Sequence, residues 1–221
     1  MIRESHIHRV YSDEKGRNTL YTKAVGRGAE EGETIREKDG IYRKFDPYHS
    51  KLAALILKGC RNVHLKQGDY VLYLGCSTGT TPTHVADIVG PSGLVFGIDI
   101  APRVMRSFYL TSERYPNLVP ILANAAQPQS YTDRICEVDY VYQDVAARRQ
   151  VDIFIENSRL FLKEGGFGFL AVKARSVDVT KKPGIIYAQV KQKLTSHFII
   201  IEERKLDPFS RDHMAFLVKR K

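Results

Sequence analysis

Residues Asp69–Thr83 read D-Y-V-L-Y-L-G-C-S-T-G-T-T-P-T, and this stretch decides the fold. Tyr70 to Leu74 form an apolar run of strand length, which Gly75 ends, and Gly79 follows four residues later. A glycine turn between a buried strand and a helix lets the backbone approach a ligand closely, with amide groups pointing at it. The pattern therefore predicts a ligand site at the end of this strand.

A helix is expected directly after the turn, with Thr80 or Thr81 as its cap and Pro82 at an early helical position. The next apolar run, Leu94 to Ile98, ends in Asp99. That is where the second strand of a nucleotide-binding βαβ unit presents an acid to a ribose diol.

The glycine spacing is Gly-x-x-x-Gly, whereas a pyrophosphate binder has Gly-x-Gly-x-x-Gly. It favours a nucleoside without a diphosphate, for which S-adenosylmethionine is the candidate cofactor. The alternative is a tight turn of purely structural purpose.

The alternation of strands and helices after residue 49 argues for a parallel sheet covered on both faces. The last two expected strands are joined by a loop without a helix, so an antiparallel strand is added. This is the topology of S-adenosylmethionine-dependent methyltransferases, a Rossmann-like α/β fold. The expected strands are 70–74, 94–98, 118–122, 138–142, 168–172, 198–203 and 214–219, and the expected helices are 50–57, 83–89, 103–114, 151–162 and 185–194.

Residues 1–48 form a different kind of segment, for which we expect a small β domain of two hairpins. The first pairs 7–11 with 19–25 around a turn at 12–16, and the second pairs 34–36 with 41–45. A connection rich in Gly and Glu, 26–33, lies between them. The expected division is therefore 1–48 and 49–221, with residues 49–221 forming the methyltransferase domain.

Composition narrows the class of protein. The 221 residues carry 34 Lys and Arg against 25 Asp and Glu, a net charge of +9 that favours a polyanionic partner. Three cysteines without C-x-x-C spacing indicate neither a disulfide framework nor a metal site. No apolar run is long enough to cross a membrane and the start has no signal-peptide core, so we expect a cytoplasmic protein without a membrane partner.

Polar residues fall where the strands of this sheet should end. Asp144 follows the fourth strand, Lys173 follows the fifth, and His213 precedes the last, while Lys51 opens the helix that leads into the sheet. Methyl transfer to a ribose 2′-hydroxyl needs in-line geometry and loss of a proton from a weak acid. A Lys-Asp-Lys set suits that chemistry, although a lysine taken singly is more often merely solvated and Asp144 could simply cap the next helix.

Several stretches carry a resemblance to a known family: Y-R-K-F-D-P-Y-H-S-K-L-A-A (42–54), V-L-Y-L-G-C-S-T-G-T-T-P-T-H-V-A-D-I-V-G-P-S-G-L-V-F (71–96), D-V-A (144–146), G-G-F-G-F-L-A-V-K-A (165–174) and R-D-H (211–213). The chain resembles fibrillarin over nearly its whole length, in the short archaeal form that lacks a Gly/Arg-rich tail. The resemblance implies a 2′-O-methyltransferase that acts on ribosomal RNA and some tRNA.

The resemblance also implies partners. The enzyme would work inside a box C/D ribonucleoprotein, with a guide RNA, a substrate RNA, a Nop-domain scaffold protein and, indirectly, a kink-turn-binding ribosomal-type protein. Two alternatives remain open: a stand-alone RNA 2′-O-methyltransferase, and a non-catalytic ribonucleoprotein subunit that keeps the fold. Basic residues in loops or at helix starts near the expected cleft could hold an RNA backbone without reading its sequence, namely Arg148, Arg149, Lys181 and Lys182. A solvated charged surface is an equally good interpretation of each of them.

Carried onto this sequence, the family's catalytic set falls on Lys51, Asp144, Lys173 and His213. Its cofactor contacts fall on the glycine turn, the acid after the second strand and the segment after the fourth, namely Gly75, Gly79, Thr80, Thr81, Asp99, Ile100, Asn124, Ala125, Asp144, Val145, Ala146 and Ala147. Three positions depart from the family pattern: Asn124 stands where an acid is usual, Ala147 where Gln is usual, and Asp99 where Glu is usual.

Overall fold

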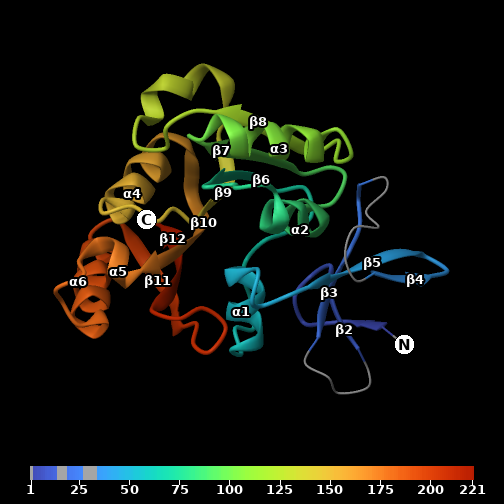
Figure 1. Cartoon of the computed structure of the whole chain (residues 1–221), viewed down its shortest axis with the longest axis horizontal. Coiled ribbons are helices and arrows are strands. Elements are labelled where there is room, and N and C mark those ends of the chain that lie inside the picture. The colour runs from blue at the N-terminus through green and yellow to red at the C-terminus, as the bar shows by residue number, and fades with distance from the viewer. Residues whose placement is uncertain (1, 14–18, 27–33) are drawn as a thin grey trace.

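The computed structural model describes residues 2–13, 19–26 and 34–221, and their strands form two sheets (Figure 1). Residues 14–16 of the turn expected at 12–16, and 27–33 of the connection expected at 26–33, lie outside the described part of the chain. The strands of the larger sheet lie between residues 70 and 220, and the smaller sheet precedes it in sequence.

The smaller sheet is antiparallel, with the strand order β1-β2-β3-β5-β4. Strand β1 was not expected, and the strand predicted at 7–11 begins instead at Val10, because a tight turn precedes it. Val10 N donates to Ile7 O at 3.0 Å, Arg9 has a φ of 56°, and the turn buries Ile7. The strands are β1 (Ile2–Glu4), β2 (Val10–Asp13), β3 (Leu20–Lys23), β4 (Thr34–Glu37) and β5 (Gly40–Phe45).

The larger sheet has the order β11-β12-β10-β9-β6-β7-β8. Strands β10, β9, β6, β7 and β8 run parallel to their neighbours, whereas β12 is antiparallel to both β10 and β11. This confirms the expected fold class. The antiparallel strand β12 lies between β10 and β11, and β11 forms the edge of the sheet. The strands are β6 (Tyr70–Leu74), β7 (Leu94–Asp99), β8 (Leu118–Leu122), β9 (Val138–Gln143), β10 (Leu162–Lys173), β11 (Phe198–Lys205) and β12 (His213–Arg220).

Helices cover both faces of the larger sheet, because the side chains of β6 point alternately into two separate cores. Val71 and Tyr73 pack into a core with α1, α2 and α3, whereas Leu72 and Leu74 pack into a second core with η1, α4 and α6. Figure 1 shows α4 and α6 together at one side and α1 and α2 toward the smaller sheet. The helices are α1 (Lys51–Leu57), α2 (Thr80–Val89), α3 (Pro102–Ser112), η1 (Pro128–Arg134), α4 (Gln150–Phe161), α5 (Ala174–Val177) and α6 (Pro183–Thr195).

The helix starts show which local predictions held. Ser50 is the N-cap of α1, as expected, and its hydroxyl accepts from Ala53 N at 3.5 Å. The prediction of Thr80 or Thr81 as the cap of α2 is wrong, because Gly79 holds that position with a φ of 104° that favours glycine. Among the described residues no helix is long and apolar enough to span a bilayer.

The two sheets are joined through α2. Thr22 of β3 donates to the Asp87 carboxylate at 2.7 Å, and Val25 N donates to its other oxygen at 2.9 Å. Arg9 Nε donates to the backbone oxygen of the same residue at 2.6 Å. The division into domains at 48 and 49 therefore stays a proposal, since polar contacts tie the smaller sheet to the helix that follows the glycine turn.

Candidate active site

A cavity of about 420 Å³ lies at the edge where the parallel strands β6, β7 and β9 end. In an open α/β sheet this is the edge at which ligands bind. The cavity is lined by nine of the residues predicted to contact a cofactor, which are Gly75, Asp99, Ile100, Asn124, Ala125, Asp144, Val145, Ala146 and Ala147.

At Gly75 the turn after β6 packs closely against the backbone of Asp144. Its φ is 82°, and a Cβ there would lie 2.6 Å from the backbone oxygen of Asp144. On the same side Asp144 N donates to Leu74 O at 3.0 Å. A side chain at position 75 would therefore push apart the loops that follow β6 and β9.

Asp99 is held by both loops beside it. Its Oδ2 accepts from Ser77 N at 3.1 Å, and its Oδ1 accepts from Ala101 N at 3.0 Å. Each carboxylate oxygen keeps a further lone pair, which is the capacity that a vicinal diol requires. The adjacent Ile100 side chain is 63% exposed and offers an apolar surface next to that acid.

Asn124 lies across the cavity after β8. Its Oδ1 accepts from Ala126 N at 2.9 Å, so the amide oxygen already takes part in a local turn. An acid at this position would accept the same bond and still present charge to a ligand, which the neutral amide does not.

The remaining expected cofactor contacts lie away from this lining. Gly79 packs under Phe108, Thr81 is buried, and Thr80 is exposed at the start of α2. Their contact with a cofactor stays a prediction. Four lining residues were missed in the sequence, namely Ser77, Ile98, Ala126 and Ile153. Of these four, only Ser77 could have been predicted from the sequence, because it lies between Gly75 and Gly79 in the glycine turn.

The first pair of the predicted catalytic set is in direct contact. Lys51 Nζ lies 2.6 Å from Asp144 Oδ2, and both side chains are about three-quarters buried, with exposures of 24% and 25%. Lys51 is the first residue of α1, fixed by the Ser50 cap, and Asp144 directly follows β9. Because Asp144 also lines the cavity, the ion pair stands at its wall.

Lys173 and His213 are opposite each other on β10 and β12. His213 Nδ1 lies 2.8 Å from Arg211 O, to which it donates, and 3.1 Å from Ser210 Oγ. Burial lowers the pKa of the His213 imidazole; Lys51 and Lys173 lower it further, and Asp144 raises it. Lys51, Asp144 and Lys173 therefore all lie close enough to His213 to affect its pKa.

The Lys173 side chain is exposed and has neither a hydrogen bond nor an ion pair with any described residue. Of the basic residues expected near the cleft, Arg149 pairs with Glu156 at 2.9 Å and Lys181 with Asp178 at 3.7 Å. Arg148 and Lys182 are exposed without an ion pair in the described chain. No cluster of three His, Cys, Asp or Glu residues able to hold a metal occurs in the described ranges.

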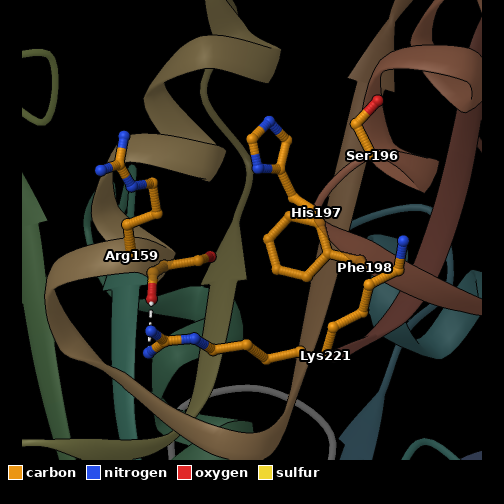
Figure 2. A pocket seen from close by; sticks show the side chains of 7 residues that line it. Arg159, Ser196, His197, Phe198 and Lys221 are labelled. Carbon is orange, nitrogen blue, oxygen red and sulfur yellow. Dashed lines mark hydrogen bonds between the residues drawn. The ribbon is translucent and has the colours of Figure 1, made fainter.

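A second hollow, of about 230 Å³, lies where β10 begins and β12 ends, at the opposite edge of the sheet. Figure 2 shows Arg159, His197 and Lys221 around the Phe198 ring. Lys221 Nζ donates to Thr195 O at 2.6 Å, and Arg220 donates to the backbone oxygens of Ser158 and Leu162. These cations thus satisfy backbone carbonyls at the ends of α4 and α6. The hollow lies at the edge of the sheet opposite to the Lys51–Asp144 ion pair.

Comparisons with known proteins show the family of this chain. The fibrillarin family profile matches residues 2–221. A fibrillarin-like rRNA/tRNA 2′-O-methyltransferase of Thermococcus onnurineus is 41% identical over 213 residues, which cover 96% of this chain and 94% of that protein.

Two solved structures are similar throughout. Aeropyrum pernix fibrillarin in complex with natively bound S-adenosyl-L-methionine has a TM-score of 0.87 at 36% identity and covers 99% of both chains. A fibrillarin in a fibrillarin/Nop5p complex has a TM-score of 0.89 at 33% identity, covering 99% of this chain and 100% of that one. The match of profile, relatives and structures over the whole length shows that this chain belongs to the fibrillarin family.

Proposed function

We propose that this protein transfers the methyl group of S-adenosylmethionine to ribose 2′-hydroxyls of ribosomal RNA and tRNA. The observation that carries the proposal is the double role of Asp144, which lines the cavity and holds the Lys51 amine at 2.6 Å. A methyl donor in the cavity would lie beside the Lys51–Asp144 ion pair, which would face the substrate. The Thermococcus relative bears the name of this activity.

The cavity suits the cofactor in size and chemistry. Its volume falls in the range of small-molecule sites, and it is lined mainly by apolar groups with a few polar ones. Asp99 would accept from the ribose hydroxyls of the cofactor, Ile100 would cover one face of the adenine, and Asn124 would meet its amino group. The similar Aeropyrum fibrillarin holds S-adenosyl-L-methionine natively.

When bound, S-adenosylmethionine supplies an electrophilic methyl group on a sulfonium. Lys173, whose side chain has no hydrogen bond or ion pair with any described residue, would accept the 2′-hydroxyl proton. The 2′-oxygen would keep the electron pair that forms the new O–CH3 bond, and the pair of the broken S–CH3 bond would stay on sulfur, leaving a neutral thioether. Asp144 would hold Lys51 against the ribose and fix its direction. His213, neutral because burial lowers its pKa, would complete the polar wall without adding charge.

Within this proposal the substrate is chosen by base pairing with a box C/D guide RNA. The chain would dock on a Nop-domain scaffold protein, as the fibrillarin of the fibrillarin/Nop5p complex does, and a kink-turn-binding protein would complete the particle. The exposed Arg148 and Lys182 would meet RNA phosphates beside the cleft without reading sequence.

Reconstitution with guide RNA, scaffold protein, kink-turn protein and radiolabelled S-adenosylmethionine tests the proposal. We expect label on the guided 2′-hydroxyl, and none when the chain acts alone. Robust methylation by the isolated chain would support the stand-alone enzyme instead. Calorimetry addresses the non-catalytic alternative, which absence of cofactor binding at high protein concentration would favour.

A further inference from the structure

Gln150 holds the main chain of Lys173. It is the first residue of α4 and is fully buried. Its Nε2 donates to Lys173 O at 3.1 Å, and its Oε1 accepts from Lys173 N at 3.1 Å. One carboxamide therefore satisfies both backbone groups of the residue that carries the proposed proton acceptor.

This contact takes the place of a missing strand partner. Strand β9 pairs with β10 only as far as Leu170, opposite Gln143, while β12 continues to Lys173 on the other side. On the β9 side the Lys173 amide and carbonyl would lack partners without the Gln150 side chain. Backbone groups withdrawn from water and left without partners are costly, and both bonds are partly buried, so the carboxamide stabilises this end of the strand.

Gln150 is in turn anchored to the cavity. Gln143, the last residue of β9, donates from its Nε2 to Gln150 O at 2.6 Å, and Gln150 N donates to Ala147 O at 3.2 Å. Gln143 precedes Asp144, and Ala147 lines the cavity. The carboxamide therefore connects the loop around the cofactor cavity to the backbone of Lys173.

We propose that Gln150 is a positioning residue for methyl transfer, acting through Lys173. The inference rests on the proposed function. A lysine amine sits on a flexible stem, so the position of its Cα limits where the amine can reach. Displacing a reacting group by about 1 Å costs roughly 100-fold in rate, and the Gln150 clamp sets that position relative to the cavity.

The test compares Gln150→Met with a matched control in the reconstituted particle. Methionine has similar length but makes neither hydrogen bond. Asn117→Leu is the control, because Asn117 is also a buried amide that donates to two backbone oxygens, those of Ala86 and Gly90, both at 2.9 Å, away from the cleft. At a temperature where both variants stay folded, Gln150→Met should lose about tenfold or more in kcat with cofactor affinity and KM unchanged, whereas Asn117→Leu should keep its kcat.

Gln150→Glu gives a signature that loss of stability alone does not produce. A protonated carboxyl group can donate to Lys173 O and accept from Lys173 N, as the amide does, whereas the ionised form cannot donate. The rate of this variant relative to the original protein should therefore fall as pH rises. The relative rate of Gln150→Met should not vary with pH.

Hydrogen exchange supplies a readout that does not depend on activity. The Lys173 amide should exchange faster in Gln150→Met than in the original protein, while the β12 amides stay protected. An unchanged exchange rate, or a kcat equal to that of Asn117→Leu, would overturn the inference. Lys173→Ala, assayed alongside, separates the two ideas: if it stays active the proposed proton acceptor is wrong, and if it is inactive while Gln150→Met is fully active only the positioning role fails.

Discussion

Arg43 of β5 donates from Nη1 to Asp87 Oδ2 of α2 at 2.8 Å, with the carboxylate fully buried and the guanidinium side chain 13% exposed. The pair crosses from the smaller sheet to the helix that starts at the glycine turn. Arg43 also donates from Nη2 to Thr83 Oγ1 at 2.9 Å on the same helix. The smaller sheet thus stabilises the helix that follows the glycine turn beside the cavity proposed for the cofactor.

Replacing Asp87 with Ala should lower the free energy of unfolding by about 3–5 kcal/mol, because it leaves the Arg43 charge buried without its partner. Urea unfolding measures the change. Glu203→Ala is the control, since the Lys191–Glu203 pair is solvent-exposed and its loss should cost about 1 kcal/mol or less. Equal costs for the two variants would contradict a buried junction.

His84 should make the protein sensitive to acid. It is fully buried beside Thr22, and burial lowers its pKa well below the usual range, with the Arg43 charge lowering it further. Below about pH 6.5 the His84 imidazole is protonated in the unfolded chain but stays neutral in the folded chain. The free energy of unfolding should therefore fall by roughly 1.4 kcal/mol for each pH unit below that value. His84→Gln should show a shallower fall between pH 7 and 5, and identical slopes would refute this assignment.

Gly75→Ala should weaken cofactor binding about tenfold or more, because its Cβ would lie 2.6 Å from Asp144 O and displace the loop that lines the cavity. Calorimetry with S-adenosylmethionine measures this. Gly165→Ala is the control: its φ of 70° imposes similar backbone strain, but the nearest atom to its Cβ is the end of the Lys219 side chain at 3.7 Å. Gly165→Ala should therefore bind cofactor normally.

Lys173→Ala should reduce methyl transfer about 100-fold or more in the reconstituted particle, because it removes the proposed proton acceptor, while cofactor binding and particle assembly persist. Single-turnover assays with labelled cofactor measure the rate. Lys66→Ala, an exposed lysine before β6 at the opposite edge of the sheet, serves as the control. A near-normal rate for Lys173→Ala would show that Lys173 is not the proton acceptor.

Asn124→Asp should tighten cofactor binding by about three- to tenfold. A carboxylate can keep the bond from Ala126 N and add a charge-assisted bond to the adenine amino group. A binding titration compares the two proteins, and Ala147→Gln provides a second restoration of the family pattern on the same cavity wall. Weaker binding by Asn124→Asp would show that the adenine does not lie against this residue.

The sequence alone determined the strands of the larger sheet and the edge of that sheet at which the cavity lies. The apolar run before Gly75 and the acid Asp99 after the next run are local signals, and both fall at strand ends as predicted. Local signals suffice because strand periodicity and glycine turns act over a few neighbouring residues. Since parallel strands end at one edge, Asp144 and Lys173 could be placed there before any contact was known.

Only the tertiary structure decided which of these residues touch. The 2.6 Å contact of Lys51 with Asp144, the Gln150 clamp on Lys173 and the entry of Ile153 into the cavity depend on the order of strands in the sheet and on how α1 and α4 pack against it. The cap at Gly79 was likewise set by the turn it closes, not by the threonines that follow. Such contacts join segments distant in sequence, and local propensity carries no information about their pairing.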